Sequence, residues 1–165
     1  DQPCPVERMS AVYALGRNPF PSAVEKLVSL LETDDNAYVR RATAWSLANY
    51  DNEIVLKPLI NSLKNDVASV RLWSSSSLAE IGSTSSFNAQ LAAEQLLISL
   101  KIDNEPVVRS NCIWSLCRLF EKLNEISQES FVDECTKIAL FDKEPSVMEE
   151  AKTALDSMGM KGFYK

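Results

Sequence analysis

An eight-residue segment that recurs along the chain is the feature that most limits what this sequence can fold into. Four copies align without gaps, and a fifth has Met in place of Arg: Arg8–Leu15 (RMSAVYAL), Arg40–Leu47 (RRATAWSL), Arg71–Leu78 (RLWSSSSL), Arg109–Leu116 (RSNCIWSL) and Met148–Leu155 (MEEAKTAL). The closing leucines of successive copies are 32, 31, 38 and 39 residues apart. A drifting period of about 30 to 40 residues is typical of paired-helix repeats and excludes coiled-coil heptads.

A second apolar segment lies between these copies. Apolar residues three or four apart, the pattern of a helix with one buried stripe, occur in AVEKLVSLL (23–31), VLKPLINSL (55–63), AAEQLLISL (92–100) and the weaker VDECTKIAL (132–140). One helix pair cannot bury its stripe alone, so the pairs must stack. The sequence therefore predicts an all-α, right-handed α-solenoid of stacked antiparallel helix pairs. We expect one domain over residues 1–165, with repeats at about 3–18 (partial), 20–51, 53–82, 90–121 and 130–159.

The irregular parts of the repeat carry three further expectations. The first repeat has only its second helix, because the sequence begins at Asp1, so an upstream helix is expected to be missing or to precede it. Gly82 is expected to end a helix, and the stretch to Asn88 (GSTSSFN) to form a loop that lengthens the third repeat. At the end of the chain, Phe163 and Tyr164 are expected either to cover the last repeat or to belong to a disordered tail.

Each predicted first helix is followed by a short polar turn that contains an acid. These acids are Asp34 and Asp35, Asp66, Asp103 and Asp142. Asp or Asn in such a turn can cap the next helix by accepting hydrogen bonds from its free N–H groups. A Val-Arg pair then opens most of the second helices. We interpret its arginines as structural and expect them to pair with the turn acid of a neighbouring repeat; they are Arg40, Arg71 and Arg109.

Composition excludes several classes of function. The chain has no His, which removes the commonest general base and the commonest metal ligand. Its charged residues are 17 Lys and Arg against 23 Asp and Glu, for a net charge of −6, which argues against a nucleic-acid partner. No apolar run approaches the roughly 18 residues of a membrane span, and no carboxylate pair is spaced for acid–base work. We therefore predict no catalytic residue and no metal site.

The four cysteines do not change this interpretation. They are Cys4, Cys112, Cys117 and Cys135, and no two of them form a C-x-x-C pair. This excludes a zinc ribbon and a thioredoxin motif. We interpret them as reduced residues that fill the core of a cytoplasmic protein.

The repeat unit resembles that of a known family. The unit, an acidic turn before Val-Arg and a Leu seven residues after the Arg, is clearest in DDNAYVRRATAWSLANY (34–50) and NDVASVRLWSSSSLAEIG (65–82). It resembles HEAT repeats, specifically the short HEAT-like repeat of cyanobacterial phycobilin lyases, and the resemblance covers nearly the whole chain. The family includes lyases that attach bilins to phycobiliproteins, factors that help dismantle phycobilisomes, and adaptors that bind iron–sulfur assembly proteins. The resemblance is specific for fold and weak for function.

The resemblance also implies where a partner would bind, because second helices line the concave face of HEAT stacks. Five residues after the repeat Arg, the family usually has a polar residue. Here the successive copies have Tyr13, Trp45, Ser76, Trp114 and Thr153. Side chains one helical turn away on either side include Arg17, Arg41, Asn49 and Arg118. Trp73 lies at a different register, and we expect it to pack between repeats.

Aromatic and Arg side chains dominate binding hot spots. The predicted binding residues are therefore Tyr13, Arg17, Arg41, Trp45, Asn49, Trp114 and Arg118. The leading hypothesis is a non-catalytic adaptor that binds a protein on the concave face. The alternative is a subunit of a phycobilin lyase, or a bilin chaperone, acting on phycobiliproteins. The candidate partners are then a phycobiliprotein subunit or a second HEAT-repeat chain, with bilin as the possible ligand and no other cofactor. Rings would stack on a flat bilin while Arg side chains pair with its carboxylates.

Overall fold

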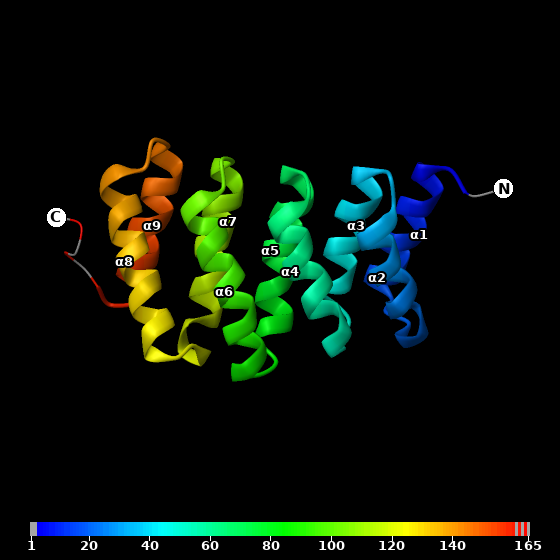
Figure 1. Cartoon of the computed structure of the whole chain (residues 1–165), viewed down its shortest axis with the longest axis horizontal. Helices are drawn as coiled ribbons and strands as arrows, with labels where there is room; N and C mark the ends of the chain where they lie inside the picture. Colours follow the sequence, from blue (N-terminus) through cyan, green and yellow to red (C-terminus); the bar gives the residue numbers. More distant parts are fainter. Residues whose placement is uncertain (1–2, 161, 163, 165) are drawn as a thin grey trace.

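The computed structural model describes residues 3–160, 162 and 164, and in this part of the chain every regular element is a helix. The α-helices are α1 (Pro5–Arg17), α2 (Val24–Thr33), α3 (Ala37–Leu47), α4 (Leu56–Asn65), α5 (Ala68–Gly82), α6 (Ser86–Ile102), α7 (Pro106–Leu119), α8 (Glu125–Phe141) and α9 (Pro145–Ser157). Short 3₁₀ turns are η1 (Pro21–Ala23), η2 (Glu53–Val55) and η3 (Phe120–Lys122). Figure 1 shows helix pairs stacked along the long axis, with the two termini at opposite ends. The predicted α-solenoid is confirmed.

The helices form two layers that enclose the core. The first helices, α2, α4, α6 and α8, form one layer, and the second helices, α1, α3, α5, α7 and α9, form the other. Fully buried leucines of both layers meet between them, such as Leu27 and Leu59 from the first helices and Leu47 and Leu78 from the second. Neighbouring second helices contact each other far more extensively than neighbouring first helices do. Because the second helices are more closely packed, the stack curves toward them, and their outer side is the concave face.

The extra residues of the third repeat extend a helix, which corrects the expected loop at Gly82–Asn88. Ser85 caps α6 by accepting a hydrogen bond from the backbone N–H of Asn88 at 3.0 Å, and α6 then runs for 17 residues against 10 in α2 and α4. Gly82 does end α5, without the positive φ of a glycine cap. It is buried, and a Cβ there would meet Leu119 Cδ2 at 3.1 Å, so close packing is the reason for a glycine.

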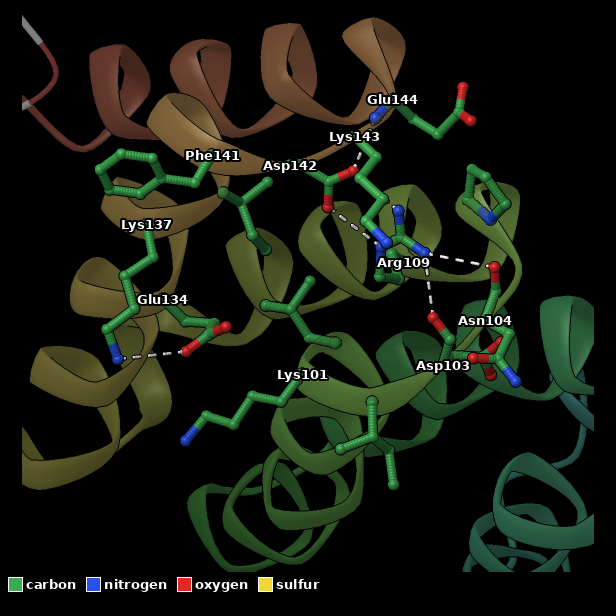
Figure 2. A pocket seen from close by; sticks show the side chains of 14 residues that line it. Lys101, Asp103, Asn104, Arg109, Glu134, Lys137, Phe141, Asp142, Lys143 and Glu144 are labelled. Carbon is green, nitrogen blue, oxygen red and sulfur yellow. Dashed lines mark hydrogen bonds and ion pairs between the residues drawn. The ribbon is translucent and has the colours of Figure 1, made fainter.

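An Arg–Asp ladder joins the turns of successive repeats, as predicted for Arg40, Arg71 and Arg109, and it also includes Arg8. The guanidinium groups of Arg8, Arg40, Arg71 and Arg109 pair with the carboxylates of Asp34, Asp66, Asp103 and Asp142, respectively. In Arg71, both Nε and Nη2 donate to the Asp103 carboxylate at 2.8 Å, and Nη1 donates to the backbone carbonyl of Asp66 at 2.8 Å. Figure 2 shows the last pair, in which Arg109 also reaches the carbonyl of Asp103. Each Arg thus joins the turn of its own repeat to that of the next.

This ladder predicts that acid destabilises the fold. Hydrogen bonding from Arg8 lowers the pKa of Asp34. Burial opposes the charge of Asp103 and Asp142, but hydrogen bonds from Arg71 and Arg109 and from backbone N–H groups outweigh it, so the pKa of each is also lowered. A carboxyl with a lowered folded-state pKa contributes stability above its unfolded pKa of about 3.9 and loses it as pH falls toward the folded value. We therefore expect the urea midpoint to be constant down to about pH 5 and then to fall steeply.

The control for this acid titration is Asp103→Asn, which removes one of the lowered pKa values. Its urea midpoint is expected to be lower at pH 7 and to change less between pH 5 and pH 3 than that of the wild type. A wild-type midpoint that stays constant down to pH 3 would show that the ladder carboxylates do not stabilise the fold.

A second ladder, made by buried serines, holds neighbouring second helices together. Ser46 Oγ donates to the carbonyl of Val12 at 2.6 Å, and Ser77 Oγ donates to that of Ala44 at 2.7 Å. Ser115 Oγ repeats the contact with the carbonyl of another serine, Ser75, at 2.8 Å. Each donor directly precedes the closing Leu of its copy. A small side chain that can donate at this position lets the helices approach closely without leaving a polar atom unsatisfied.

The described part of the C-terminal tail folds back on the last repeat. Gly159 has a φ of 78°, and the backbone N–H of Met160 donates to the carbonyl of Leu155 at 2.8 Å, which is how helices commonly end. Met160 and Tyr164 pack against the core, and the Tyr164 hydroxyl donates to Asp156 at 2.6 Å. Tyr164 therefore covers part of the last repeat as expected, whereas Phe163 lies outside the described residues.

Candidate partner-binding face

The structure places the predicted aromatic positions on the second helices, along the concave face. On α3 the exposed or half-buried side chains Tyr38, Arg41 and Trp45, and Asn49 in the turn after it, follow one another at spacings of three or four residues. The equivalent stripe on α7 is Val107, Ser110, Trp114 and Arg118. Spacings of three and four keep side chains on one side of a helix. Trp114 is 39% exposed, while Trp45 and Tyr13 are half-buried.

The aromatic rings of α1 and α3 form a pair. Tyr13 and Trp45 lie with ring centroids 5.4 Å apart at an interplanar angle of 61°, an edge-to-face arrangement of the kind aromatic pairs prefer. Gly16 makes room for it, because a Cβ at Gly16 would overlap the Trp45 ring and lie 2.5 Å from Ser46 Oγ. The glycine thus lets the ring lie directly on the backbone of α1. The pair thus joins two neighbouring second helices, α1 and α3, at the concave face.

The arginines of the concave face differ in their partners. The guanidinium of Arg118 lies 5.1 Å from the centroid of the Trp114 ring and pairs with Glu80 at 2.9 Å. That of Arg41 lies 5.3 Å from the Tyr38 ring centroid, so the structure brings it to Tyr38 rather than to Trp45. Arg41 Nε is buried without a hydrogen-bond partner among the described residues. Arg17 and Asn49 are exposed.

The concave face carries residues that the sequence interpretation missed. Trp73 was expected to pack between repeats, but it is 37% exposed, so that expectation was wrong. Tyr38 and Val107, which are 63% and 57% exposed, extend the stripes by one turn toward the helix N-termini. The signal was present, because both residues directly precede the Val that comes before the repeat Arg. With these residues the face offers more apolar surface than the predicted set alone.

A cavity of about 410 Å³ opens on the concave face between α7 and α9. Its lining is Val107, Ser110, Asn111, Trp114, Ser146 and Glu150. Glu150 is the one charged side chain in this lining. A second cavity, of about 460 Å³, lies at the edge of the stack between two turns, and Figure 2 shows it from close by. There Arg109 pairs with Asp142 and Lys137 with Glu134, so much of its charge is already neutralised within the chain. The concave cavity is the better candidate for a partner side chain.

The described residues offer little for catalysis. No group of three or more Cys, Asp or Glu in them could hold a metal ion. Burial raises the pKa of Cys112 and Cys135 and, with the charge of Glu150 adding to it, that of Cys117 to about 11. Thiols with raised pKa values are poor nucleophiles, because the thiolate is the reactive form. None of the helices described here is both long and apolar enough to cross a membrane.

Comparison with known proteins shows which repeats and which solved structures this chain is similar to. A family model of HEAT repeats matches residues 1–79. The complex of CpcE and CpcF of phycocyanin lyase from Nostoc sp. matches with a TM-score of 0.65 and 22% identity, covering 90% of this chain and 98% of that one. A designed armadillo repeat protein in complex with the peptide (KR)4 matches with a TM-score of 0.64 and 19% identity, covering 99% and 86%. No curated protein matches the chain in sequence.

At these identities the two structures establish the fold alone. The family match covers the first copies of the repeat, and the Arg–Asp ladder continues the same architecture as far as α9. Residues 1–79 are thus similar to HEAT repeats, and the chain as a whole has the fold of an α-solenoid.

Proposed function

We propose that this chain is a non-catalytic adaptor that binds a segment of another protein on its concave face. The observation that carries the proposal is the row of exposed or half-buried aromatic and apolar side chains on consecutive second helices. These are Val6, Tyr13, Tyr38, Trp45, Trp73, Val107 and Trp114. Exposed apolar side chains scattered singly need no explanation, but apolar residues gathered on one face mark interaction sites.

The chemistry of the face supports a protein partner. Trp, Tyr and Arg are the residues that most often dominate the energy of protein interfaces, and three Trp occur on the second helices α3, α5 and α7. The Tyr13–Trp45 pair and the Trp114–Arg118 stack fix their rings in place, so a partner does not have to order them on binding. The solved structures of similar fold include a complex with a peptide and a complex of two chains.

The test is a selection from a phage-displayed library of random peptides on the immobilised full chain. The groove variant is Trp45→Ala with Trp114→Ala, and the matched control is Phe87→Ala with Phe141→Ala, which removes two exposed rings from first helices. Peptides selected on the wild type should bind the control equally well and the groove variant at least about 30-fold more weakly. Thermal unfolding of both variants checks that each is folded.

Equal binding of the selected peptides to the groove variant, or loss of binding in the control, would overturn the assignment of the concave face. A library that yields no peptide bound by the wild type would count against an adaptor that recognises linear segments.

A second candidate function is that of a subunit of a phycobilin lyase or a bilin chaperone. Arg17 and Arg41 form no ion pair with any described carboxylate, and they lie on the same helices as the Tyr13–Trp45 pair. A flat dianion could stack on such rings while Arg side chains pair with its carboxylates. Phycocyanobilin added to the wild-type protein should then quench Trp fluorescence, and the Arg41→Ala variant should show weaker quenching. The adaptor proposal expects no saturable quenching.

A further inference from the structure

The charges of the concave face are separated along the stack. Five of the seven arginines form ion pairs with described carboxylates, and the two that do not are Arg17 on α1 and Arg41 on α3. In the middle of the face, Glu80 of α5 and Arg118 of α7 neutralise each other at 2.9 Å. The face is therefore positive at its N-terminal end and neutral in its centre.

The C-terminal end of the face is acidic. Glu149 and Glu150 both lie on α9, where Glu149 is 2.7 Å from Lys152 and Glu150 forms no ion pair with the described basic residues. Glu150 and Trp114 line the same cavity of about 410 Å³. A Trp ring beside a carboxylate suits the side chain of Lys or Arg, because the ring stacks on the cation and the carboxylate neutralises it. Arg118 lies over the Trp114 ring but pairs with Glu80, so it leaves the Glu150 carboxylate without a counter-charge.

The distance between the two ends matches a short extended peptide. From α3 to α9 there are three steps between neighbouring second helices, and packed helices are about 8 to 10 Å apart. The span is therefore about 24 to 30 Å, and an extended chain that rises about 3.3 Å per residue covers it with eight or nine residues. Side chains this far apart on one partner can reach both ends only if the segment lies along the groove.

We propose that the concave face binds an extended segment with acidic residues at one end, held by Arg17 and Arg41, and a basic residue at the other, held by Trp114 and Glu150. This inference rests on the proposed adaptor function and specifies its partner. A uniformly basic segment would bring positive charge against the two arginines, and a uniformly acidic one would bring negative charge against Glu150 and a chain of net charge −6. Complementary charges favour one register and reject partners of the wrong pattern.

The test measures the binding of fluorescein-labelled peptides of about ten residues by fluorescence anisotropy at low salt. All share a central segment of Leu, Ser and Gly, and differ at their ends: acidic at both, basic at both, or acidic at one and basic at the other, the last made in both chain directions. We expect the wild type to bind one of the mixed peptides about tenfold more tightly than either uniform peptide. Added salt should reduce this preference, because it screens exposed charges.

Charge-reversal variants assign each end. Arg17→Glu with Arg41→Glu should shift the preference to the uniformly basic peptide, and Glu150→Lys should shift it to the uniformly acidic one. The control Lys57→Glu with Lys64→Glu changes the net charge as much as the Arg double variant does, but on exposed positions of α4, and should keep the wild-type order. A shift of preference in this control would mean that only net charge is sensed, which would overturn the inference.

The failure of this inference differs from the failure of the adaptor proposal. If all four peptides bind with equal affinity, and Trp45→Ala with Trp114→Ala removes their binding, the concave face binds peptides without selecting them by charge. The charge inference then fails and the adaptor proposal stands. If that Trp variant binds every peptide as the wild type does, the concave face is not the binding site and both proposals fail.

Discussion

Replacing Asp103 with alanine is expected to lower the free energy of unfolding by about 2 to 3 kcal/mol. The Asp103 side chain is 6% exposed and accepts two hydrogen bonds from Arg71, whose own side chain is 19% exposed. It also accepts a hydrogen bond from the backbone N–H of Glu105 at 2.9 Å. Without the carboxylate, a largely buried guanidinium loses its counter-charge. The remaining exposure of Arg71 is the reason to expect less than the loss at a fully buried pair.

The matched control is Asp35→Ala in the turn before α3. Asp35 also lies near an arginine of the ladder, with its Oδ1 3.2 Å from Arg8 Nη2, but its side chain is 94% exposed. Exposed pairs contribute little, so this variant should change the free energy of unfolding by less than about 0.5 kcal/mol. Urea denaturation followed by circular dichroism measures both. Equal losses of unfolding free energy in the two variants would mean that burial of the carboxylate does not set the effect.

The Asp103→Ala variant also tests whether the ladder makes the repeats unfold as one cooperative unit. Each repeat of a solenoid contacts only its neighbours, so cooperativity depends on the interfaces between them. Arg71 lies on α5 and Asp103 lies in the turn before α7, so their loss weakens an interface in the middle of the stack. We expect the urea transition of Asp103→Ala to be broader as well as earlier than that of the wild type.

Most of the ladder could be predicted from the sequence because it depends on one local rule repeated three times, at Arg40, Arg71 and Arg109. A Val-Arg pair after an acidic turn recurs at a fixed register, and each Arg has the next turn acid within reach. The cross-helix pair of Glu80 and Arg118 follows the same logic, since both occupy the same register in adjacent copies. It was not predicted, because Arg118 was assigned to the partner instead.

Trp73 was placed wrongly because the helix face was assigned from register alone. It shares the register of Ala42 in the preceding copy, which was assigned to the inward face, and Ala42 is indeed fully buried. The structure shows that this register lies at the edge of the concave face, where a small side chain is covered and a large ring extends into the open. Its counterpart on α7, Asn111, is half-buried and donates to Ser75 and Ser76 of α5. Side-chain size decides burial at such a boundary position.

The serine ladder escaped the sequence interpretation for a different reason. Ser46, Ser77 and Ser115 are fully or almost fully buried, yet Ser in a helix is usually an exposed residue. The signal was its recurrence directly before the closing Leu in three of the five copies, with Ala in the other two. A position restricted to Ser and Ala indicates a site where two helices touch.

The predicted binding residues remain a prediction, because their placement on the concave face is seen but their contact with a partner is not.

Replacing Ser77 with leucine is expected to lower the free energy of unfolding by about 3 kcal/mol, the upper range for overpacking in a core. Ser77 is 1% exposed, and its hydroxyl donates to the carbonyl of Ala44, a residue with no exposed surface. A leucine there has no space and also removes the hydrogen bond. The control is Ser10→Leu, at an exposed position of α1, which should change stability by less than about 0.5 kcal/mol. Urea denaturation again measures the two losses.

The Ser77 variant also connects the packing of the repeats to the binding face. The contact with Ala44 sets how closely α5 approaches α3, and these helices carry Trp73 and Trp45. A leucine between them should push the two helices apart and alter the span of the groove. A folded Ser77→Leu protein should therefore bind peptides selected on the wild type more weakly than Ser10→Leu does. If it is destabilised but binds these peptides equally well, the peptides contact only one of the helices α3 and α5 and do not bind across both.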